Sequence, residues 1–221
     1  MTISDMHSMF RTLGQQKGMQ HIRAILPEEI DDYLNGAIID FCREVLAIGS
    51  KTQYPDKRSL RDNAIVPYNA LRTLYAENPK QVGRTQTNEH FDLTLTKAAS
   101  EYLAIIGTDV NYVKDGRRYQ CRIVEPTKIG YILNDYCNKP TKTEPVCIID
   151  SDASQKAEIH IYTDGNAPYQ CFVHTINMPK TVSSKDNVNC DLPDYVHQEI
   201  VERAVDKFFK SVGATTHQVK Q

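Results

Sequence analysis

Residues 27–48 of this 221-residue chain read PEEIDDYLNGAIIDFCREVLAI, and they carry its strongest periodic pattern. Apolar side chains recur there every three or four positions, which predicts a helix with one buried stripe. That stripe comprises Ile30, Tyr33, Leu34, Ala37, Ile38, Phe41 and Val45. Pro27 suits the first helical turn, where its missing N–H would have no partner anyway. Asn35-Gly36 is a turn dipeptide, but the stripe continues through it, so we predict a continuous helix at a cost of about 1 kcal/mol for the glycine.

Two further amphipathic helices are predicted, one near each end of the chain. Met6, Met9, Phe10 and Leu13 repeat at helical spacing and indicate a short N-terminal helix. A second helix is predicted over residues 192–213, beginning at Leu192-Pro193. Its stripe comprises Val196, Ile200, Val201, Ala204, Val205, Phe208 and Val212. Gly213 is expected to end this helix as a left-handed cap, and the polar tail 214–221 is expected to fray.

The middle of the chain predicts strands. Apolar and polar residues alternate over residues 91–96, FDLTLT, as in a half-buried strand. Further strands are predicted over Tyr102–Ile106, Val110–Lys114, Arg117–Glu125, Val146–Ile149, Glu158–Tyr162 and Tyr169–Ile176. Asp115-Gly116 predicts one hairpin turn, and Thr163–Asn166 predicts another between the last two strands. Pro126 is expected to open a short helix between these strands.

This order of elements predicts an α+β fold, in which an antiparallel sheet of short strands is flanked by N-terminal and C-terminal amphipathic helices. We predict a single domain over residues 1–221. Its parts are a helical N-terminal region (1–48), a polar basic loop region (51–90), a strand-rich middle (91–190) and the C-terminal helix (192–213).

Composition narrows the functional classes. The net charge is −2, so the charge balance alone predicts no general affinity for nucleic acid. No stretch approaches the roughly 20 apolar residues of a membrane helix, and the N-terminus lacks a signal-peptide pattern. We therefore expect a chain made in the cytoplasm, without membrane contact. The six cysteines form no Cys-x-x-Cys pair and are expected to be reduced thiols, buried singly.

Catalytic and metal-binding motifs are missing from the sequence. Cys171 and His174 resemble half of a metal site with His160, but their odd offset places them on opposite faces of a strand. Cys42 lies at the edge of the predicted helical stripe, which favours a core position over a nucleophile. We therefore predict no catalytic residue, no metal, no cofactor and no enzymatic activity.

Asp150-Ser151-Asp152 offers two carboxylates that could bind a cation, but Asp and Ser at the end of a strand more commonly cap a turn. One alternative function therefore stays open, a hydrolase of unrecognised type that uses Asp150, Asp152 or His160. Its requirement is that carboxylates and a histidine converge in a concave site.

Positive charge gathers in residues 51–84, with tyrosines interleaved, which leaves a nucleic-acid-binding module as another alternative. The candidate DNA-facing residues are Lys51, Lys57, Arg58, Arg61, Arg72 and Arg84.

The N-terminal methionines suggest two roles, because methionine adapts to irregular surfaces. The segment either covers the domain's own core or docks on a neighbouring subunit. The candidate interface residues, there and at the C-terminus, are Met6, Met9, Phe10, Val212, Gln218 and Val219.

Several segments together resemble the ring, or head-to-tail adaptor (connector), proteins of short-tailed bacteriophages, in particular the crAss-like phages. They are LPEEI at 26–30, EVL at 44–46, PTKIGYIL at 126–133, IHIY at 159–162 and LPDYVHQEIVERAV at 192–205. The segments touch most of the chain, although residues 51–84 have no counterpart.

This resemblance implies a structural virion protein without catalytic residues. Such proteins stack as closed homo-oligomeric rings under the portal, typically with twelve-fold symmetry, and extend the channel through which packaged DNA passes. Their partners are the portal protein and other tail or ring proteins, in the neck and tail region of a virion assembled in the bacterial cytoplasm. A closed ring requires a heterologous, head-to-tail interface between identical subunits.

Overall fold

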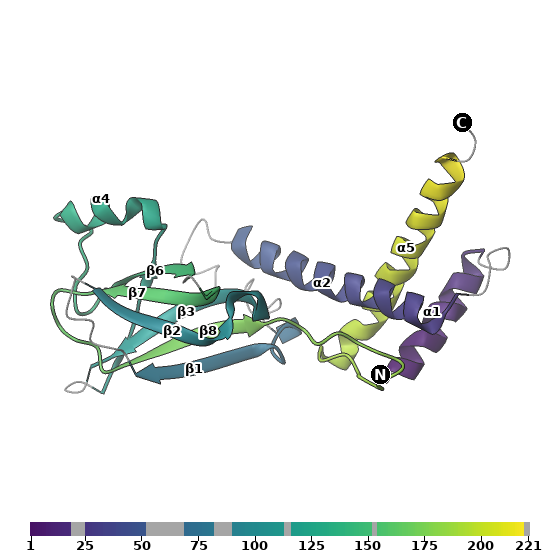
Figure 1. Ribbon diagram of the computed structural model, residues 1–221, viewed down its shortest axis with the longest axis horizontal. Helices are drawn as coiled ribbons and strands as arrows, with labels where there is room; N and C mark the ends of the chain where they lie inside the picture. Colours follow the sequence, from purple (N-terminus) through teal and green to yellow (C-terminus); the bar gives the residue numbers. More distant parts are fainter. Residues whose placement is uncertain (19–24, 52–68, 82–89, 113–115, 152–153, 219–221) are drawn as a thin grey trace. The chain divides into compact units, whose positions relative to one another are not determined.

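The computed structural model describes residues 1–18, 25–51, 69–81, 90–112, 116–151 and 154–218. The chain divides into two compact units (Figure 1). The helical unit comprises Met1–Leu74 and Pro179–Gln221, and the sheet unit comprises Tyr75–Met178. The α+β class is confirmed, with helices near both ends of the chain and mainly antiparallel strands between them.

The division into two units differs from the prediction of one domain over residues 1–221. Both ends of the chain build the helical unit, and the whole sheet unit is inserted between them. The physical reason is that the apolar stripes of the helices pack on one another. The strands meanwhile bury their apolar faces in a core of their own.

Within the described residues, the helical unit is built mainly from α1 (Ile3–Gln16), α2 (Pro27–Lys51) and α5 (Asp194–Gln218). Helix α5 packs against both of the others. Ion pairs flank the contact between α2 and α5, where Lys207 Nζ lies 2.6 Å from Asp40 and Arg203 pairs with Glu44. The predicted stripes of α2 and α5 are confirmed as this unit's core, because their central residues are almost fully buried.

Helix α1 begins at a capping box, in which the Thr2 side chain accepts from the backbone N–H of Asp5 and the Asp5 carboxylate accepts from the N–H of Thr2. Its buried face carries Phe10, whose ring lies edge-on to Phe208 of α5 with centroids 6.1 Å apart. The N-terminal helix thus covers the core of its own unit.

The loop before α5 is fixed to α2 by side chains rather than by regular structure. Asn35 brackets one residue of this loop, since its amide donates to the carbonyl of Val182 and accepts from the same residue's N–H. Asp31 accepts from the N–H of Ser184. The turn-type dipeptide Asn35-Gly36 therefore lies inside α2 as predicted, and its asparagine is used to hold the loop.

The sheet unit contains two four-stranded sheets, ordered β1-β8-β3-β4 and β2-β7-β6-β5 (Figure 1). The first sheet is antiparallel throughout, and in the second β5 runs parallel to β6. The strands are β1 (Tyr75–Gln81), β2 (His90–Ala98), β3 (Tyr102–Asn111), β4 (Arg118–Gln120), β5 (Arg122–Ile123), β6 (Val146–Ser151), β7 (Lys156–Tyr162) and β8 (Gln170–Asn177). A short helical segment, η3 (Pro126–Lys128) and α4 (Ile129–Asn134), links β5 to β6, and η2 (Ala99–Glu101) links β2 to β3.

The two sheets share one core. Leu93, Ile159 and Ile161 from one sheet and Val110, Cys171 and Val173 from the other belong to a single buried cluster. In β7 the burial alternates strictly, with Ala157, Ile159 and Ile161 inside, so the residues between them face outward. This alternation places His160 on the outer face of the second sheet.

Three local predictions differ from the structure. Strand β1 lies within the predicted loop region 51–90. The predicted hairpin around Thr163–Asn166 does not form, because β7 and β8 belong to different sheets. Helix α5 continues through Gly213 to Gln218, so the glycine does not end it and the predicted frayed tail is helical as far as Gln218.

No helix in the described part of the chain is long and apolar enough to cross a membrane.

Candidate functional site

The predicted interface residues at the N-terminus lie in the core of the helical unit. Met6 and Phe10 are fully buried there, and Met9 is half-buried. Of the C-terminal candidates, Val212 is half-buried, Gln218 is the last residue of α5 and Val219 lies outside the described residues. Of the two roles predicted for the methionine segment, the structure therefore supports the covering of its own core.

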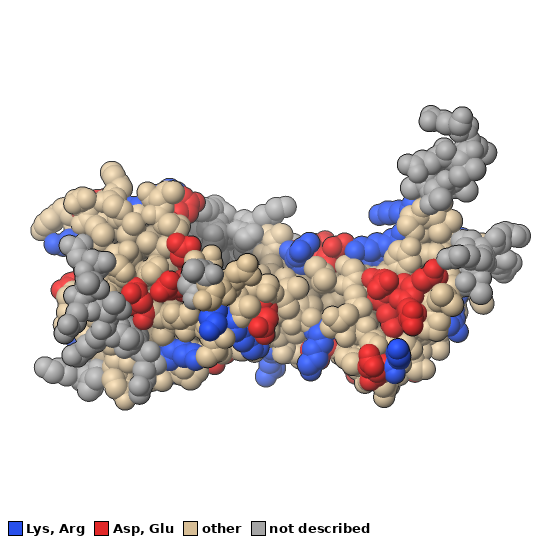
Figure 2. All heavy atoms as spheres, viewed as in Figure 1, with Lys and Arg blue, Asp and Glu red and all other residues tan. Residues whose placement is uncertain are grey.

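Of the predicted DNA-facing residues, the structure describes the side chain of Arg72 alone, and it is exposed. Lys51 ends α2, while Lys57, Arg58, Arg61 and Arg84 lie outside the described residues. On the face shown in Figure 2, the described basic side chains are interspersed with acidic ones rather than gathered in one patch. Because the side chains of the other five candidates are not described, the nucleic-acid alternative stays a prediction.

Cys171, His174 and His160 are not brought together. Cys171 is in the shared core, whereas His174, three residues later, pairs with partners on the outer face of the first sheet. His160 lies on the outer face of the second sheet. The sequence argument from the odd offset between Cys171 and His174 is confirmed.

A different cluster forms around His160. In β2, His90 and Asp92 are two residues apart and so share one face of the strand. The antiparallel register of β2 and β7 places Asp92 directly opposite His160 and His90 opposite Tyr162. Neighbouring strands thus bring two imidazoles and a carboxylate together from residues that are far apart in sequence.

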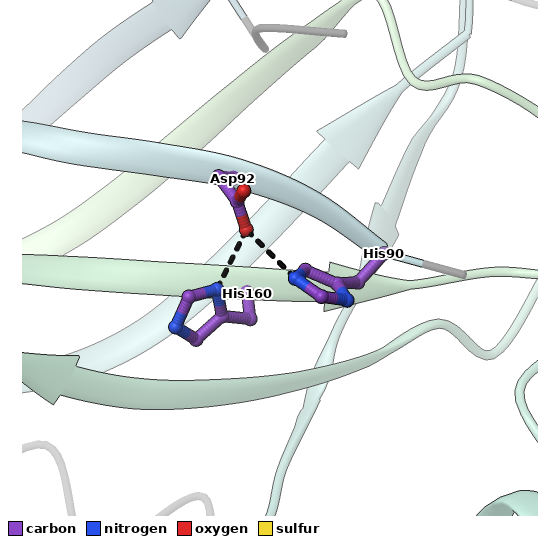
Figure 3. A group of neighbouring side chains, drawn as sticks. All are labelled: His90, Asp92 and His160. Atoms are coloured by element: carbon purple, nitrogen blue, oxygen red, sulfur yellow. Dashed lines mark hydrogen bonds and ion pairs between the residues drawn. The ribbon is translucent and has the colours of Figure 1, made fainter. Parts of the chain in front are cut away.

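The geometry of this cluster is compact (Figure 3). One oxygen of Asp92, Oδ1, lies 2.6 Å from Nδ1 of His160 and 3.1 Å from Nε2 of His90. The two imidazole rings meet edge to face with centroids 5.1 Å apart. The three side chains are between 20% and 25% exposed, so solvent reaches them from one side. One carboxylate oxygen therefore joins both rings at a place that a small ligand can reach.

Asp150 lies on the same outer face but one step further along the sheet. It pairs with Glu158 across β6 and β7, whereas His160 pairs with Ile148. The carboxylate that contacts His160 is Asp92 rather than Asp150, whose Oδ1 accepts from the N–H of Ser151. Asp152 lies outside the described residues. The hydrolase alternative named His160 but not its carboxylate partner.

A second polar chain lies on the first sheet. Nδ1 of His174 is hydrogen-bonded to the Tyr75 hydroxyl at 2.6 Å. Its Nε2 lies 3.1 Å from Oδ2 of Asp109. The Tyr75 and His174 rings are stacked, with centroids 6.0 Å apart. This chain ties β1, β8 and β3 together side by side, and the imidazole is held at both nitrogens.

The cysteines are free thiols, as predicted. They are not all buried singly, however, because Cys121, Cys147 and Cys171 share the core of the sheet unit. Burial raises the pKa of Cys42 and that of Cys171 to about 12, so both stay protonated at neutral pH. Cys42 is accordingly unsuited to be a nucleophile.

Cys137 is expected to be the thiol that reacts fastest with an aromatic disulfide reagent in the native protein, because it is exposed while the core thiols are buried. The measurement is the time course of labelling before and after urea denaturation. Cys137→Ser should abolish the fast phase, and Cys42→Ser should leave it unchanged. A fast phase that survives in Cys137→Ser would contradict the exposure pattern.

Two tyrosines stand out on the α4 segment, defined here as residues 126–138. Tyr131 and Tyr136 are 78% and 86% exposed. Figure 1 shows α4 set apart from the strands of the sheet unit and joined to them by connecting segments. Tyrosine is enriched in protein interfaces, where its ring is buried and its hydroxyl stays hydrogen-bonded. The segment thus has the character of a contact surface.

No protein-family model matches this chain, and neither does any curated protein. Function is therefore inferred from the residues and their geometry.

Proposed function

We propose that this chain is a structural virion subunit that forms a ring between the portal and the tail of a short-tailed phage and extends the DNA channel. The resemblance of residues 26–30, 44–46, 126–133, 159–162 and 192–205 to ring adaptor proteins is the starting point. The structural observation that carries the proposal is the division into two units with separate cores.

Two units suit a ring because head-to-tail association needs two different surfaces on each subunit, one for each neighbour. A chain with one unit inserted into another offers such surfaces without symmetry. The helical unit buries its own apolar stripes. The exposed tyrosines of the α4 segment then supply anchors for a neighbouring copy of the chain.

The first test is the mass of the purified chain, alone and with the portal protein, by light scattering and negative-stain imaging. We expect a closed ring, either alone or on the portal. A monomer that does not associate in either condition would overturn the proposed function.

The α4 surface is tested with the double substitution Tyr131→Ser and Tyr136→Ser. Because both side chains are exposed, we expect an unchanged fold by circular dichroism. Subunit association should weaken by about 30-fold or more, since an interface anchor typically contributes at least about 2 kcal/mol. The matched control is Tyr169→Ser, an exposed tyrosine of the same unit outside the α4 segment, which should assemble normally. Equal assembly of the double variant and the control would show that the α4 segment is not the contact.

A further inference from the structure

The cluster of His90, Asp92 and His160 is not used by the proposed ring function, and its chemistry points elsewhere. It is the group of three His, Cys, Asp or Glu side chains within the described residues whose ligand atoms converge, all within 4.8 Å of one another. We propose that these three residues bind one divalent transition-metal ion, with zinc as the principal candidate, on the outer face of the sheet unit.

The two carboxylate–imidazole distances are close to those of a metal site, and the ligand atoms of the two imidazoles lie within 4.8 Å of each other. Ligand atoms around a tetrahedral zinc ion are about 3.3 Å apart, as follows from bonds of about 2.0–2.1 Å. In the cluster, Asp92 Oδ1 is 2.6 Å from one imidazole nitrogen and 3.1 Å from the other. An ion placed among them would push the carboxylate and the His160 ring apart by less than about 1 Å.

The backbone already aims the three side chains at one point. His90 and Asp92 share a face of β2 because they are two residues apart, and the register sets His160 opposite Asp92 (Figure 3). Ligands on paired strands of a sheet keep their spacing better than ligands on loops. Binding of the ion would therefore cost little conformational entropy.

The donor set decides the class of ion. Two imidazole nitrogens and one carboxylate oxygen suit zinc, cobalt, nickel, copper and iron, whereas calcium and magnesium prefer oxygen ligands alone. Three protein ligands leave at least one coordination position for water or for another donor. The partial exposure of all three side chains gives the ion a route from solvent.

The consequence for the protein is a cross-link between β2 and β7. These strands already pair over His90–Thr94, and the ion would join their outward-facing side chains at the start of β2. Because the three ligands come together only in the folded sheet unit, the metal would bind the native state in preference to the unfolded chain and stabilise it.

The experiment uses the full chain, treated with a chelator and then dialysed. Isothermal titration calorimetry with zinc chloride should show binding of zinc to the chain, and this binding should be lost when the cluster is disrupted. Titration with Co²⁺ should give visible absorption bands typical of low coordination number. A zinc concentration about 100 times the Kd should raise the Tm of the sheet unit by roughly 10 °C.

Two substitutions test the ligands, Asp92→Asn and His160→Gln. Each should weaken zinc binding by more than the about 10–100-fold that loss of an outer-shell partner costs. The matched control is His174→Gln, which removes a histidine that also contacts a carboxylate in the same unit. That control should bind zinc as the unsubstituted chain does.

Asp92→Asn keeps the shape of the side chain, and circular dichroism without metal checks that the variant folds. Absence of zinc binding to the unsubstituted chain would overturn the proposal, as would equal binding by Asp92→Asn, His160→Gln and the control. The ring proposal does not depend on this result, because assembly is measured separately in the presence of chelator.

Discussion

Phe10→Ala is expected to lower the free energy of unfolding of the helical unit by about 3–5 kcal/mol, as large-to-small substitutions of buried aromatics do. The Phe10 side chain is fully buried, and its ring packs edge-on against Phe208 of α5. Tyr33 of α2 packs against the same Phe208 ring, with centroids 5.5 Å apart. Removal of Phe10 would therefore leave a cavity on Phe208 where α1 meets α5.

The measurement is a urea titration followed by far-UV circular dichroism, in which the midpoint falls while the slope is unchanged. Arg11→Ala is the matched control, because Arg11 follows Phe10 in the same helix and is exposed. The control should change stability by less than about 0.5 kcal/mol. If the two variants were equally stable, α1 would not be part of the core, and the segment would again be a candidate for docking on a neighbour.

The helices could be predicted from sequence because their periodicity reports burial directly. Ile30, Leu34 and Ile38 were placed on one stripe, and each is at most 1% exposed. The same logic gave the helical form of the N-terminal segment. Periodicity could not decide whether the N-terminal segment packs on its own unit or on a partner, because either arrangement buries the same face. That choice depends on Phe208, which is distant in sequence.

Strand β1 was missed for a physical reason. Its sequence, YAENPKQ, shows no apolar alternation and contains Pro79. Both features are tolerated because β1 is the edge strand of its sheet, with β8 as its one neighbour among the described strands. The hairpin predicted at Thr163–Asn166 failed for the opposite reason. Its turn residues favour a hairpin locally, but the strands on either side, β7 and β8, belong to different sheets.

Only part of the histidine cluster could be predicted from the sequence. The spacing His90-x-Asp92 next to the predicted strand 91–96 was a usable signal, because residues two apart share one face of a strand. The sequence also points to His160, but it suggests Cys171 and His174, or Asp150 and Asp152, as its companions rather than Asp92. Which strand lies beside β7 is set by the sheet order, and no local pattern in the sequence contains that information.

Asp31→Ala is expected to cost the helical unit about 2–4 kcal/mol, because it removes the acceptor of two hydrogen bonds and each buried group left unsatisfied costs about 1–3 kcal/mol. Asp31 is 8% exposed, and Oδ1 lies 2.7 Å from Nε2 of His7, which is itself buried. Its other oxygen accepts from the N–H of Ser184 at 2.8 Å. One carboxylate thus links α1, α2 and the loop before α5, and its removal leaves the His7 imidazole and the Ser184 N–H without that partner.

The matched control for this prediction is Asp32→Ala, the exposed neighbour in the same helical turn, which should be within about 0.5 kcal/mol of the unsubstituted chain. A double-mutant cycle with His7→Ala separates the pair from the loop contact. The coupling between His7 and Asp31 should be about 0.5–3 kcal/mol, and the remainder belongs to Ser184. If Asp31→Ala cost no more than Asp32→Ala, packing alone would hold α1 on the unit. Phe10, rather than the buried carboxylate, would then account for the docking of the N-terminal helix.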